Sequence, residues 1–350
     1  MAPKESFATF EPGRKIIPMF TEPNVARIEL ARLPTPIDHL ETLSREIGVN
    51  LHIKRDDLTG SALSGNKVRK LEYLLPHALA LGADTVISCG GVQSNHCRAT
   101  ALAARRLGLD VELFLRGLEP DSPTEGNLFL DKLLGSVTHS LTAAEYMERN
   151  GIMHQRAEEL QARGRQAYVI PEGGSNALGS LGYVRCMHEI VEQQKERGIA
   201  FDHLVCATGS GGTLAGLLAG AEIHGFSGRI WGVPVSGNAE IAARCVNRVL
   251  HDLRSSFFSD LKAHIPPENM LDGHVGSGYG RASDEDLERI RDLAIMTGLI
   301  LDPVYTNKAF GGLLRLIRER TAAPDSAVLF VHTGGIFGLF PFAGRLEKLL

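Results

Sequence analysis

Long apolar segments and basic clusters are both missing from the 350-residue sequence. A membrane-spanning helix needs about 20 predominantly apolar residues, and no run in this chain approaches that length. The first residues, MAPKESFATFEPGRK, carry charges where a secretory signal peptide would have its apolar core. The formal net charge is −4, and lysine and arginine do not cluster as nucleic-acid binding requires. We therefore expect a cytoplasmic protein with a small soluble substrate and no membrane or nucleic-acid partner.

Cysteine is also scarce, and its positions argue against a zinc site. The chain has five cysteines without close paired spacings, namely Cys89, Cys97, Cys186, Cys206 and Cys245. The segment HEIVE at 188–192 begins like a zinc-protease helix but has Glu192 where the second histidine must stand. We therefore expect reduced, mostly buried thiols and no bound metal.

Short stretches rich in β-branched residues alternate with amphipathic stretches along most of the chain. The predicted strands lie at 84–90, 110–117, 166–174, 202–209, 229–237 and 326–335, and the predicted helices at 94–107, 126–135, 179–197, 213–224 and 238–255. This alternation predicts an α/β protein with parallel strands and helices on both faces. Nearly every strand ends in glycine and small polar residues, and ligands bind at that edge of an open α/β sheet.

The segment LTGSALSGNKVRKLEYLLP, at 58–76, places Lys67 where a small-residue loop becomes a helix. Gly60 and Gly65 are spaced as in a P-loop, but Asn66 separates Gly65 from the lysine, and Val68 offers no hydroxyl for magnesium. A nucleophilic lysine is the other interpretation. Two rival lysines lie nearby: Lys54 is expected at a polar strand end, and Lys70 as a surface charge.

Two further segments combine small polar residues with a following helix. In GGVQSNHCRATALAARRLG, at 90–108, Ser94, Asn95 and His96 begin an alanine-rich helix, where they suit either helix capping or a bound carboxylate. In CATGSGGTLAGLLAG, at 206–220, a strand is followed by a glycine-rich and hydroxyl-rich turn. Leu214 stands where a dinucleotide fingerprint needs glycine or alanine, so the turn fits one phosphate group better.

With these three segments, the sequence resembles the fold type II pyridoxal-phosphate enzymes, the tryptophan synthase beta-like group. Within it, the sequence is most similar to the branch of D-cysteine desulfhydrase and 1-aminocyclopropane-1-carboxylate deaminase. The match runs from LPTPIDHL at 33–40 to HTGG at 332–335. The motifs occur in family order: IKRDDLTG, SGNKVRKLE, GGVQSNHCRATA, PEGGSNALGSLGY, ATGSGGT, GSGYG, DPVYTNK and HTGG. Ser64 and Gly65 stand where many relatives have two glycines.

The resemblance implies two open, twisted, mostly parallel sheets flanked by helices. It implies a large domain formed by 1–68 and 175–350 and a small inserted α/β domain at 69–174, with pyridoxal 5'-phosphate between them. Homodimers are usual in the family. A P-loop nucleotide-binding protein and a non-catalytic amino-acid sensor are the alternatives from other classes.

The same resemblance assigns roles to individual residues. Lys67 forms a Schiff base with the cofactor and is a candidate base for the Cα proton, because a helix N-terminus favours its neutral form. Tyr305 stacks on the cofactor ring, Tyr279 faces the substrate, and Asn95 also lies near the cofactor hydroxyl. The substrate carboxylate is held by Ser94, Asn95 and His96, and the cofactor phosphate by Thr208, Gly209, Ser210, Gly211, Gly212 and Thr213.

The reaction predicted from this resemblance depends on Thr306 and Thr333, which correspond to family positions near the pyridine nitrogen. Ring-opening deaminases typically carry Glu and Leu there, and a carboxylate would keep that nitrogen protonated. Two hydroxyls suit a β-substituent that departs readily, so we expect D-cysteine desulfhydrase activity, giving pyruvate, hydrogen sulfide and ammonia. L-cysteate sulfo-lyase, 1-aminocyclopropane-1-carboxylate deaminase and amino-acid racemase remain alternatives.

Overall fold

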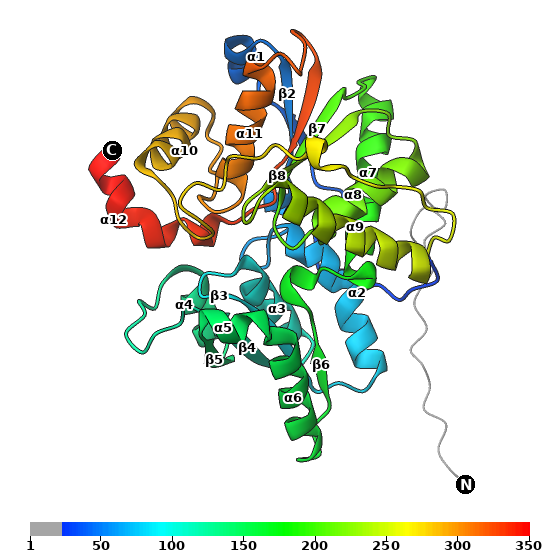
Figure 1. Ribbon diagram of the computed structural model, residues 1–350, viewed down its shortest axis with the longest axis vertical. Coiled ribbons are helices and arrows are strands. Elements are labelled where there is room, and N and C mark those ends of the chain that lie inside the picture. Colours follow the sequence, from blue (N-terminus) through cyan, green and yellow to red (C-terminus); the bar gives the residue numbers. More distant parts are fainter. Residues whose placement is uncertain (1–22) are drawn as a thin grey trace.

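The computed structural model describes residues 23–350, which form an upper and a lower part in Figure 1, each built on its own sheet. The start of the chain, on which the signal-peptide argument depends, lies outside the described residues, as does part of the predicted 1–68 segment. None of the helices within 23–350 combines the length and apolar character that crossing a membrane would take.

The upper sheet has five strands in the order β1-β2-β9-β7-β8. Only β1 runs antiparallel to its neighbour. The strands are β1 (Ile37–His39), β2 (Asn50–Lys54), β9 (Ala327–Val331), β7 (His203–Thr208) and β8 (Arg229–Pro234). Both faces are buried because alternate residues enter two different cores: Leu204 and Leu329 lie in one, and Val205 and Phe330 in the other.

Helices cover both faces of this sheet, as the alternating pattern predicts. One core includes residues of α7 (Ala177–Arg197), α8 (Gly212–His224) and α9 (Ala239–Ser256). The other includes residues of α1 (Glu41–Ile47), α10 (Asp284–Thr297) and α11 (Thr306–Arg318). Near the end of the chain, α12 (Ala343–Leu346) packs against this second core through Leu346.

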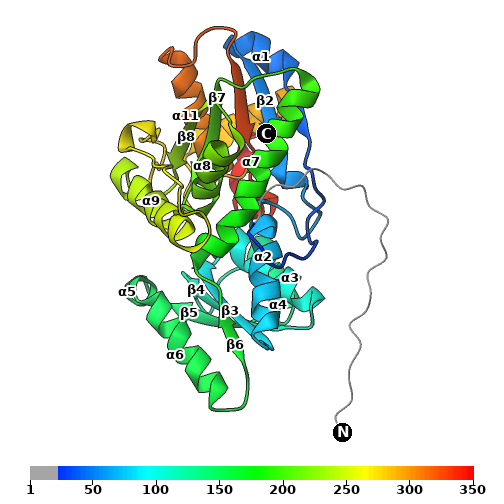
Figure 2. The ribbon, with the colours of Figure 1, turned by 90° about the vertical axis from the view of Figure 1, so that its right-hand side faces the viewer.

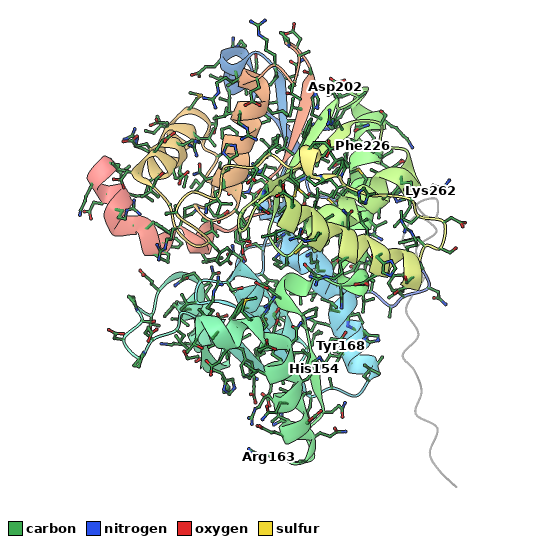
Figure 3. The ribbon with its side chains drawn as sticks, viewed as in Figure 1. His154, Arg163, Tyr168, Asp202, Phe226 and Lys262 are labelled. Atoms are coloured by element: carbon green, nitrogen blue, oxygen red, sulfur yellow. The ribbon has the colours of Figure 1, made fainter. Side chains whose placement is uncertain are left out.

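The lower sheet has four parallel strands in the order β5-β4-β3-β6. They are β5 (Val137–Leu141), β4 (Asp110–Arg116), β3 (Thr85–Gly91) and β6 (Ala167–Val169). Its helices are α3 (Asn95–Arg106), α4 (Gly126–Leu133), α5 (Ala143–Met147) and α6 (Arg149–Gln161). Figure 2 shows α6 and β6 at the end farthest from α1, and Figure 3 places Tyr168 and His154 in this lower part and Asp202 and Phe226 in the upper one.

Helix α2 (Asn66–Ala80) lies between the two parts in both views. Its Tyr73 packs in an upper core, whereas Val68, Leu71 and Leu74 pack in a core of the lower part. The predicted boundary between 68 and 69 falls inside this helix. The domain division stays a prediction, and all strands of the lower sheet fall within its 69–174 segment.

The fold class and the predicted elements are confirmed, with small shifts at most ends. The strand predicted at 166–174 is shorter, because only β6 is extended and Glu172–Gly174 forms a 3-10 helix. The pattern did not identify the strands β1 and β5 or the helices α1, α5, α6, α10 and α11. Only Leu141 of β5 is buried, and the strand lacks the apolar run that marks most of the other strands.

Candidate active site

Lys67 is the second residue of α2, and the residue before this helix, Gly65, has a conformation that brings two backbone segments together. Gly65 has φ +89°, and a Cβ atom there would lie 2.8 Å from the carbonyl oxygen of Thr333. The loop is held by the Thr59 hydroxyl, which accepts from the Gly65 amide at 2.8 Å. Burial lowers the pKa of Lys67 to about 8, although the negative charge of Glu172 opposes that shift. Lys67 therefore has the chemistry of a nucleophile or base.

A cleft of about 720 Å³ joins Lys67 to most of the other predicted residues. It is lined, among others, by Ser94, Asn95, His96, Thr208, Gly209, Ser210, Gly211, Thr213, Tyr279, Tyr305 and Thr333. Gly212 and Thr306 are absent from the lining. The cleft lies where carboxyl ends of both parallel sheets meet, as expected for open α/β sheets.

The glycine turn at 209–212 fits a phosphate group. Gly211 has φ +91° and precedes the first turn of α8, whose backbone N–H groups lack intrahelical acceptors. A Cβ atom at Gly211 would come within 3.0 Å of the backbone of Cys245, so only glycine leaves this space free. The Gly212 amide donates to the Ser175 hydroxyl at 3.2 Å, and Ser175 and Ser210 share a hydrogen bond of 2.7 Å.

The three polar residues at the start of α3 are held in different ways. The Ser94 hydroxyl caps the helix by accepting from the Cys97 amide at 3.2 Å, so the capping interpretation holds for this residue. Asn95 accepts from the Asn127 side chain at 3.0 Å. Burial, followed by the charge of Lys67, lowers the pKa of His96, whose Nε2 pairs with the Ser88 hydroxyl at 2.9 Å. The binding of a carboxylate here stays a prediction.

Lys70 is buried, and its expected role as a surface charge is wrong. Its ammonium donates to the Gly173 carbonyl oxygen at 3.0 Å and to the Ser175 hydroxyl at 3.1 Å, directly below the glycine turn. Burial and the charge of Lys67 lower its pKa. The reason is that α2 is covered on both sides, so one turn along the helix does not reach solvent.

Lys54 ends β2, as expected, but it is fully buried away from the cleft lining. Its ammonium pairs with Glu189 at 3.2 Å and donates to the Thr35 carbonyl oxygen at 2.8 Å. Because these partners bind its ammonium group, Lys54 is a weaker candidate than Lys67 for the nucleophilic lysine.

The two tyrosines of the cleft contact each other. Their hydroxyls are 2.5 Å apart, and the rings meet edge to face with centroids 5.9 Å apart. Burial raises the pKa of Tyr279 to about 12, and it also raises the pKa of Tyr305 well above its usual value. Both side chains are therefore neutral hydrogen-bonding groups at ordinary pH.

Of the two threonines, Thr333 lines the cleft and Thr306 does not. The Thr306 hydroxyl donates to the Asp302 carboxylate at 2.7 Å, and the Tyr305 amide donates to the same carboxylate at 3.0 Å. Burial raises the pKa of Asp302. Sequence reasoning missed this carboxylate, which stands one side chain behind the cleft. The proximity of either threonine to a cofactor nitrogen stays a prediction.

Sequence reasoning also missed one wall of the cleft, formed by Arg116, Tyr146, Arg149 and Glu172. Glu172 accepts from the Tyr146 hydroxyl at 2.8 Å and pairs with Arg149 at 2.9 Å. The Arg116 guanidinium lies 4.7 Å from the ring centroid of Tyr146 and 5.4 Å from that of Tyr279. The position of Arg116 at the carboxyl end of a strand was the available signal.

The geometry fits pyridoxal phosphate, since a buried lysine of lowered pKa and a glycine turn suited to phosphate line one cleft. The family model described as "Pyridoxal-phosphate dependent enzyme" matches residues 28–334, and the chain belongs to this family. The cofactor is therefore pyridoxal 5'-phosphate. Membership in this family argues against a P-loop nucleotide-binding protein and against a non-catalytic amino-acid sensor.

Individual relatives and one solved structure are similar to this chain over nearly its whole length. A Thermotoga maritima protein, provisionally named a 1-aminocyclopropane-1-carboxylate deaminase, is 43% identical over 91% of this chain and 99% of its own. The D-cysteine desulfhydrase of Serratia proteamaculans is 38% identical over 90% of this chain and 96% of its own. A solved structure titled as an ACC deaminase homologue has a TM-score of 0.85 and 42% identity, covering 93% of this chain and 97% of that one.

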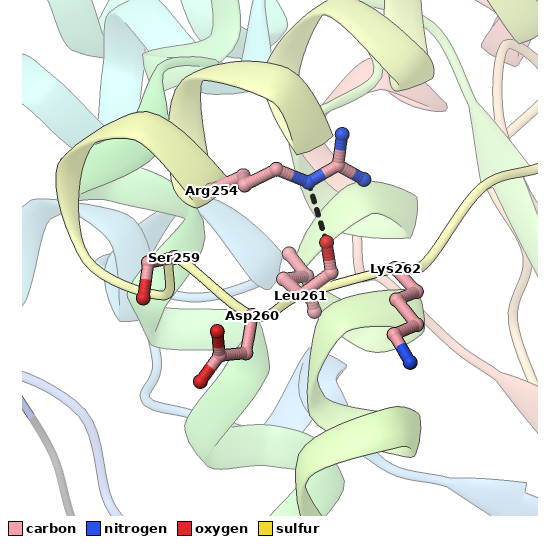
Figure 4. A pocket seen from close by; sticks show the side chains of 5 residues that line it. All are labelled: Arg254, Ser259, Asp260, Leu261 and Lys262. Atoms are coloured by element: carbon pink, nitrogen blue, oxygen red, sulfur yellow. Dashed lines mark hydrogen bonds between the residues drawn. The ribbon is translucent and has the colours of Figure 1, made fainter.

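A second hollow, away from the cleft, is lined by Arg254, Ser259, Asp260, Leu261 and Lys262 (Figure 4). Arg254 donates there to the Leu261 carbonyl oxygen, and the hollow is open to solvent. Across residues 23–350, no three His, Cys, Asp or Glu side chains gather so as to hold a metal ion. The five cysteines are free, and all but Cys245 are buried.

Proposed function

We propose that this protein catalyses a pyridoxal-phosphate-dependent α,β-elimination on a small amino acid, with D-cysteine as the principal substrate and pyruvate, hydrogen sulfide and ammonia as products. The observation that carries the proposal is the environment of Lys67. Its amine is buried, its pKa is lowered to about 8, and it shares a cleft with the glycine turn and the N-terminus of α3. This combination suits a lysine that binds an aldehyde and moves a proton.

Individual residues of the chain have distinct roles in this reaction. Lys67 would hold the cofactor through its amine, and the same amine would take the Cα proton of the bound substrate. The turn at 209–213 and Lys70 hold the phosphate, and the start of α3 at Ser94 orients the substrate carboxylate. Tyr279 and Tyr305 close the side of the cleft and exclude water. The cofactor, when bound, supplies the electron sink that makes the Cα proton acidic.

Support for D-cysteine comes from the cleft lining and from the names of two relatives, one of which, from Arabidopsis thaliana, is named for both activities. Thr333 offers a hydroxyl at the cleft wall, and Glu172 is already paired with Arg149. The Serratia relative bears the name D-cysteine desulfhydrase. Against it, Asp302 stands behind Thr306, and the Thermotoga relative bears a deaminase name, which keeps 1-aminocyclopropane-1-carboxylate deaminase as the second candidate.

One assay separates the candidates. D-cysteine, L-cysteine, L-cysteate and 1-aminocyclopropane-1-carboxylate are supplied side by side, and pyruvate, 2-oxobutanoate, sulfide and sulfite are measured. The three chiral substrates are also checked for racemisation. We expect pyruvate and sulfide from D-cysteine. Efficient 2-oxobutanoate formation with little sulfide would overturn the D-cysteine assignment and the threonine argument with it.

The role of Lys67 has its own test. The purified protein should show a visible absorption band that borohydride abolishes, and peptide mapping should then find the pyridoxyl group on Lys67. Lys67→Ala should lack the band, whereas Lys54→Ala, altered at the paired lysine, should keep it if it folds. Attachment to another lysine would refute the assignment.

The proposal also includes a homodimer in the cytoplasm. The family resemblance supports the dimer, and the five free thiols suit a reducing compartment. Light scattering of the purified protein and fractionation of the native cells are the corresponding measurements.

A further inference from the structure

Arg116 is the last residue of β4 in the lower sheet, and its side chain lines the cleft. The glycine turn at 209–212 belongs to the upper part instead. Its backbone is paired with Gly91 of β3 on one side and with Leu141 of β5 on the other, and its carbonyl oxygen accepts from the Val92 amide at 3.0 Å. The strand end is therefore anchored on both sides. The side chain is half-buried and packs over Tyr146 and Tyr279, which hold the guanidinium over aromatic faces.

No carboxylate neutralises this guanidinium among residues 23–350. Glu172, the acidic residue of the lining, pairs instead with Arg149 at 2.9 Å and accepts from Tyr146 at 2.8 Å. Arg149 is thus ion-paired within this wall, whereas Arg116 has no such pair among the described residues. A guanidinium stays charged in proteins, so Arg116 presents a permanent positive charge and free N–H donors to the cleft.

We propose that Arg116 is a specificity-determining residue that binds the β-substituent of the amino-acid substrate as an anion. The inference rests on the proposed function, because it concerns the side chain of the same substrate. The substituent class is a compact anionic sulfur or oxygen group: a sulfonate or carboxylate that is already charged, or a sulfur atom that becomes charged as it leaves. A planar guanidinium accepts such groups through two N–H donors at once.

The position of Arg116 separates this subsite from the other two anion sites of the cleft. The phosphate turn belongs to β7 and α8 of the upper sheet, and the expected carboxylate site to the start of α3, after β3. Arg116 lies one strand further along, beside Tyr146 of α5. A substrate whose carboxylate lies at the start of α3 would direct the side chain that carries its β-substituent toward the wall formed by Arg116 and Tyr146.

In the elimination, the Cα–H and Cβ–S bonds break and a Cα–Cβ double bond forms. The proton passes to the Lys67 amine, and the sulfur leaves with the bonding electron pair. The departing group therefore carries a negative charge that the fixed guanidinium stabilises. Water supplies the oxygen of pyruvate when the amine is later released as ammonia.

Binding of unreactive amino acids tests the subsite directly. Holoenzyme is titrated with aspartate and with its neutral isostere asparagine, each as both enantiomers, and dissociation constants are read from the cofactor absorbance. The variants are Arg116→Met and Arg116→Lys. The matched control is Arg106→Met, which removes the same charge at the exposed far end of α3. Wild type and Arg106→Met should bind one enantiomer of aspartate about 10–100-fold more tightly than asparagine. Arg116→Met should lose that preference with little change for asparagine, and Arg116→Lys should keep part of it.

A wild type without preference for aspartate over asparagine would overturn the proposal, and this readout needs no variant to fold. Equal weakening of both ligands in Arg116→Met would also overturn it, because Arg116 would then serve the α-carboxylate. In turnover assays of Arg116→Met, a loss of kcat/KM confined to L-cysteate would show that Arg116 binds a substituent that is already anionic. A loss shared with D-cysteine would show that Arg116 binds the sulfur as it departs. Absence of a 2-oxo acid from every substrate would refute the proposed function and leave the binding result standing.

Discussion

Lys67 should react with an aldehyde at a pH where an ordinary lysine is inert. Its pKa of about 8 compares with 10.5 for an exposed lysine. At pH 7 the neutral fraction is then about one in ten rather than about one in 3,000, an advantage of about 300-fold in reactive amine. Burial causes the shift by penalising the charged form, so the neutral form gains as pH rises through 8.

The assay follows covalent attachment of pyridoxal to protein stripped of its cofactor, between pH 6 and 10. Pyridoxal lacks the phosphate, whose own charge would raise the lysine's pKa. The rate should rise tenfold per pH unit below about 8 and level off above it. Glu172→Gln should move the inflection lower, because Glu172 raises the pKa of Lys67, whereas Glu196→Gln, at an exposed position, should not. A profile that still climbs to pH 10, or an unmoved inflection in Glu172→Gln, would refute the reasoning.

Three other substitutions have distinct expected outcomes. Lys70→Met should weaken binding of pyridoxal phosphate by about tenfold and of pyridoxal by less than about twofold, because the lost amine, which donates to Ser175, lies beside the glycine turn; equal losses by absorbance titration would contradict this. Ser94→Ala should cost about 1–3 kcal/mol in kcat/KM with cofactor loading intact, and unchanged kinetics would count against the carboxylate site. Lys308→Met removes the bonds from its ammonium to the Val275 and Gly278 carbonyl oxygens, 2.7 and 2.8 Å long, which hold the loop of Tyr279. Hydrogen exchange should rise at 275–280, and unaltered protection would show that the loop is held otherwise.

The features predicted from sequence are those with a local cause. Gly65 and Gly211 mark positions that need positive φ, and Ser94 marks a helix start, so the segments around Lys67 and the glycine turn could be singled out. The burial of Lys70 has no local signal. It follows from the packing of α2 between two cores, which depends on residues far apart in the chain.

The same distinction explains the missed wall and the orientation of Thr306. Arg116 acquires its meaning from Tyr146 and Tyr279, which lie on separate segments of the chain. Thr306 is turned away from the cleft by Asp302, four residues earlier, whose carboxylate also accepts backbone amides at the start of α11. A motif comparison aligns Thr306 with a functional position but does not show which way its hydroxyl points.

Strand β9 gives the upper sheet a particular order of assembly on the ribosome. It is the last strand in the chain, yet it lies between β2 and β7, and Thr333 and Gly334 of the cleft lie two and three residues after its end. Until 327–331 has emerged, β2 lacks its inner neighbour and β7 pairs only with β8, so the growing chain carries two open strand edges. Premature termination before Ala327 therefore removes part of the cleft and leaves a fragment with edges that favour aggregation.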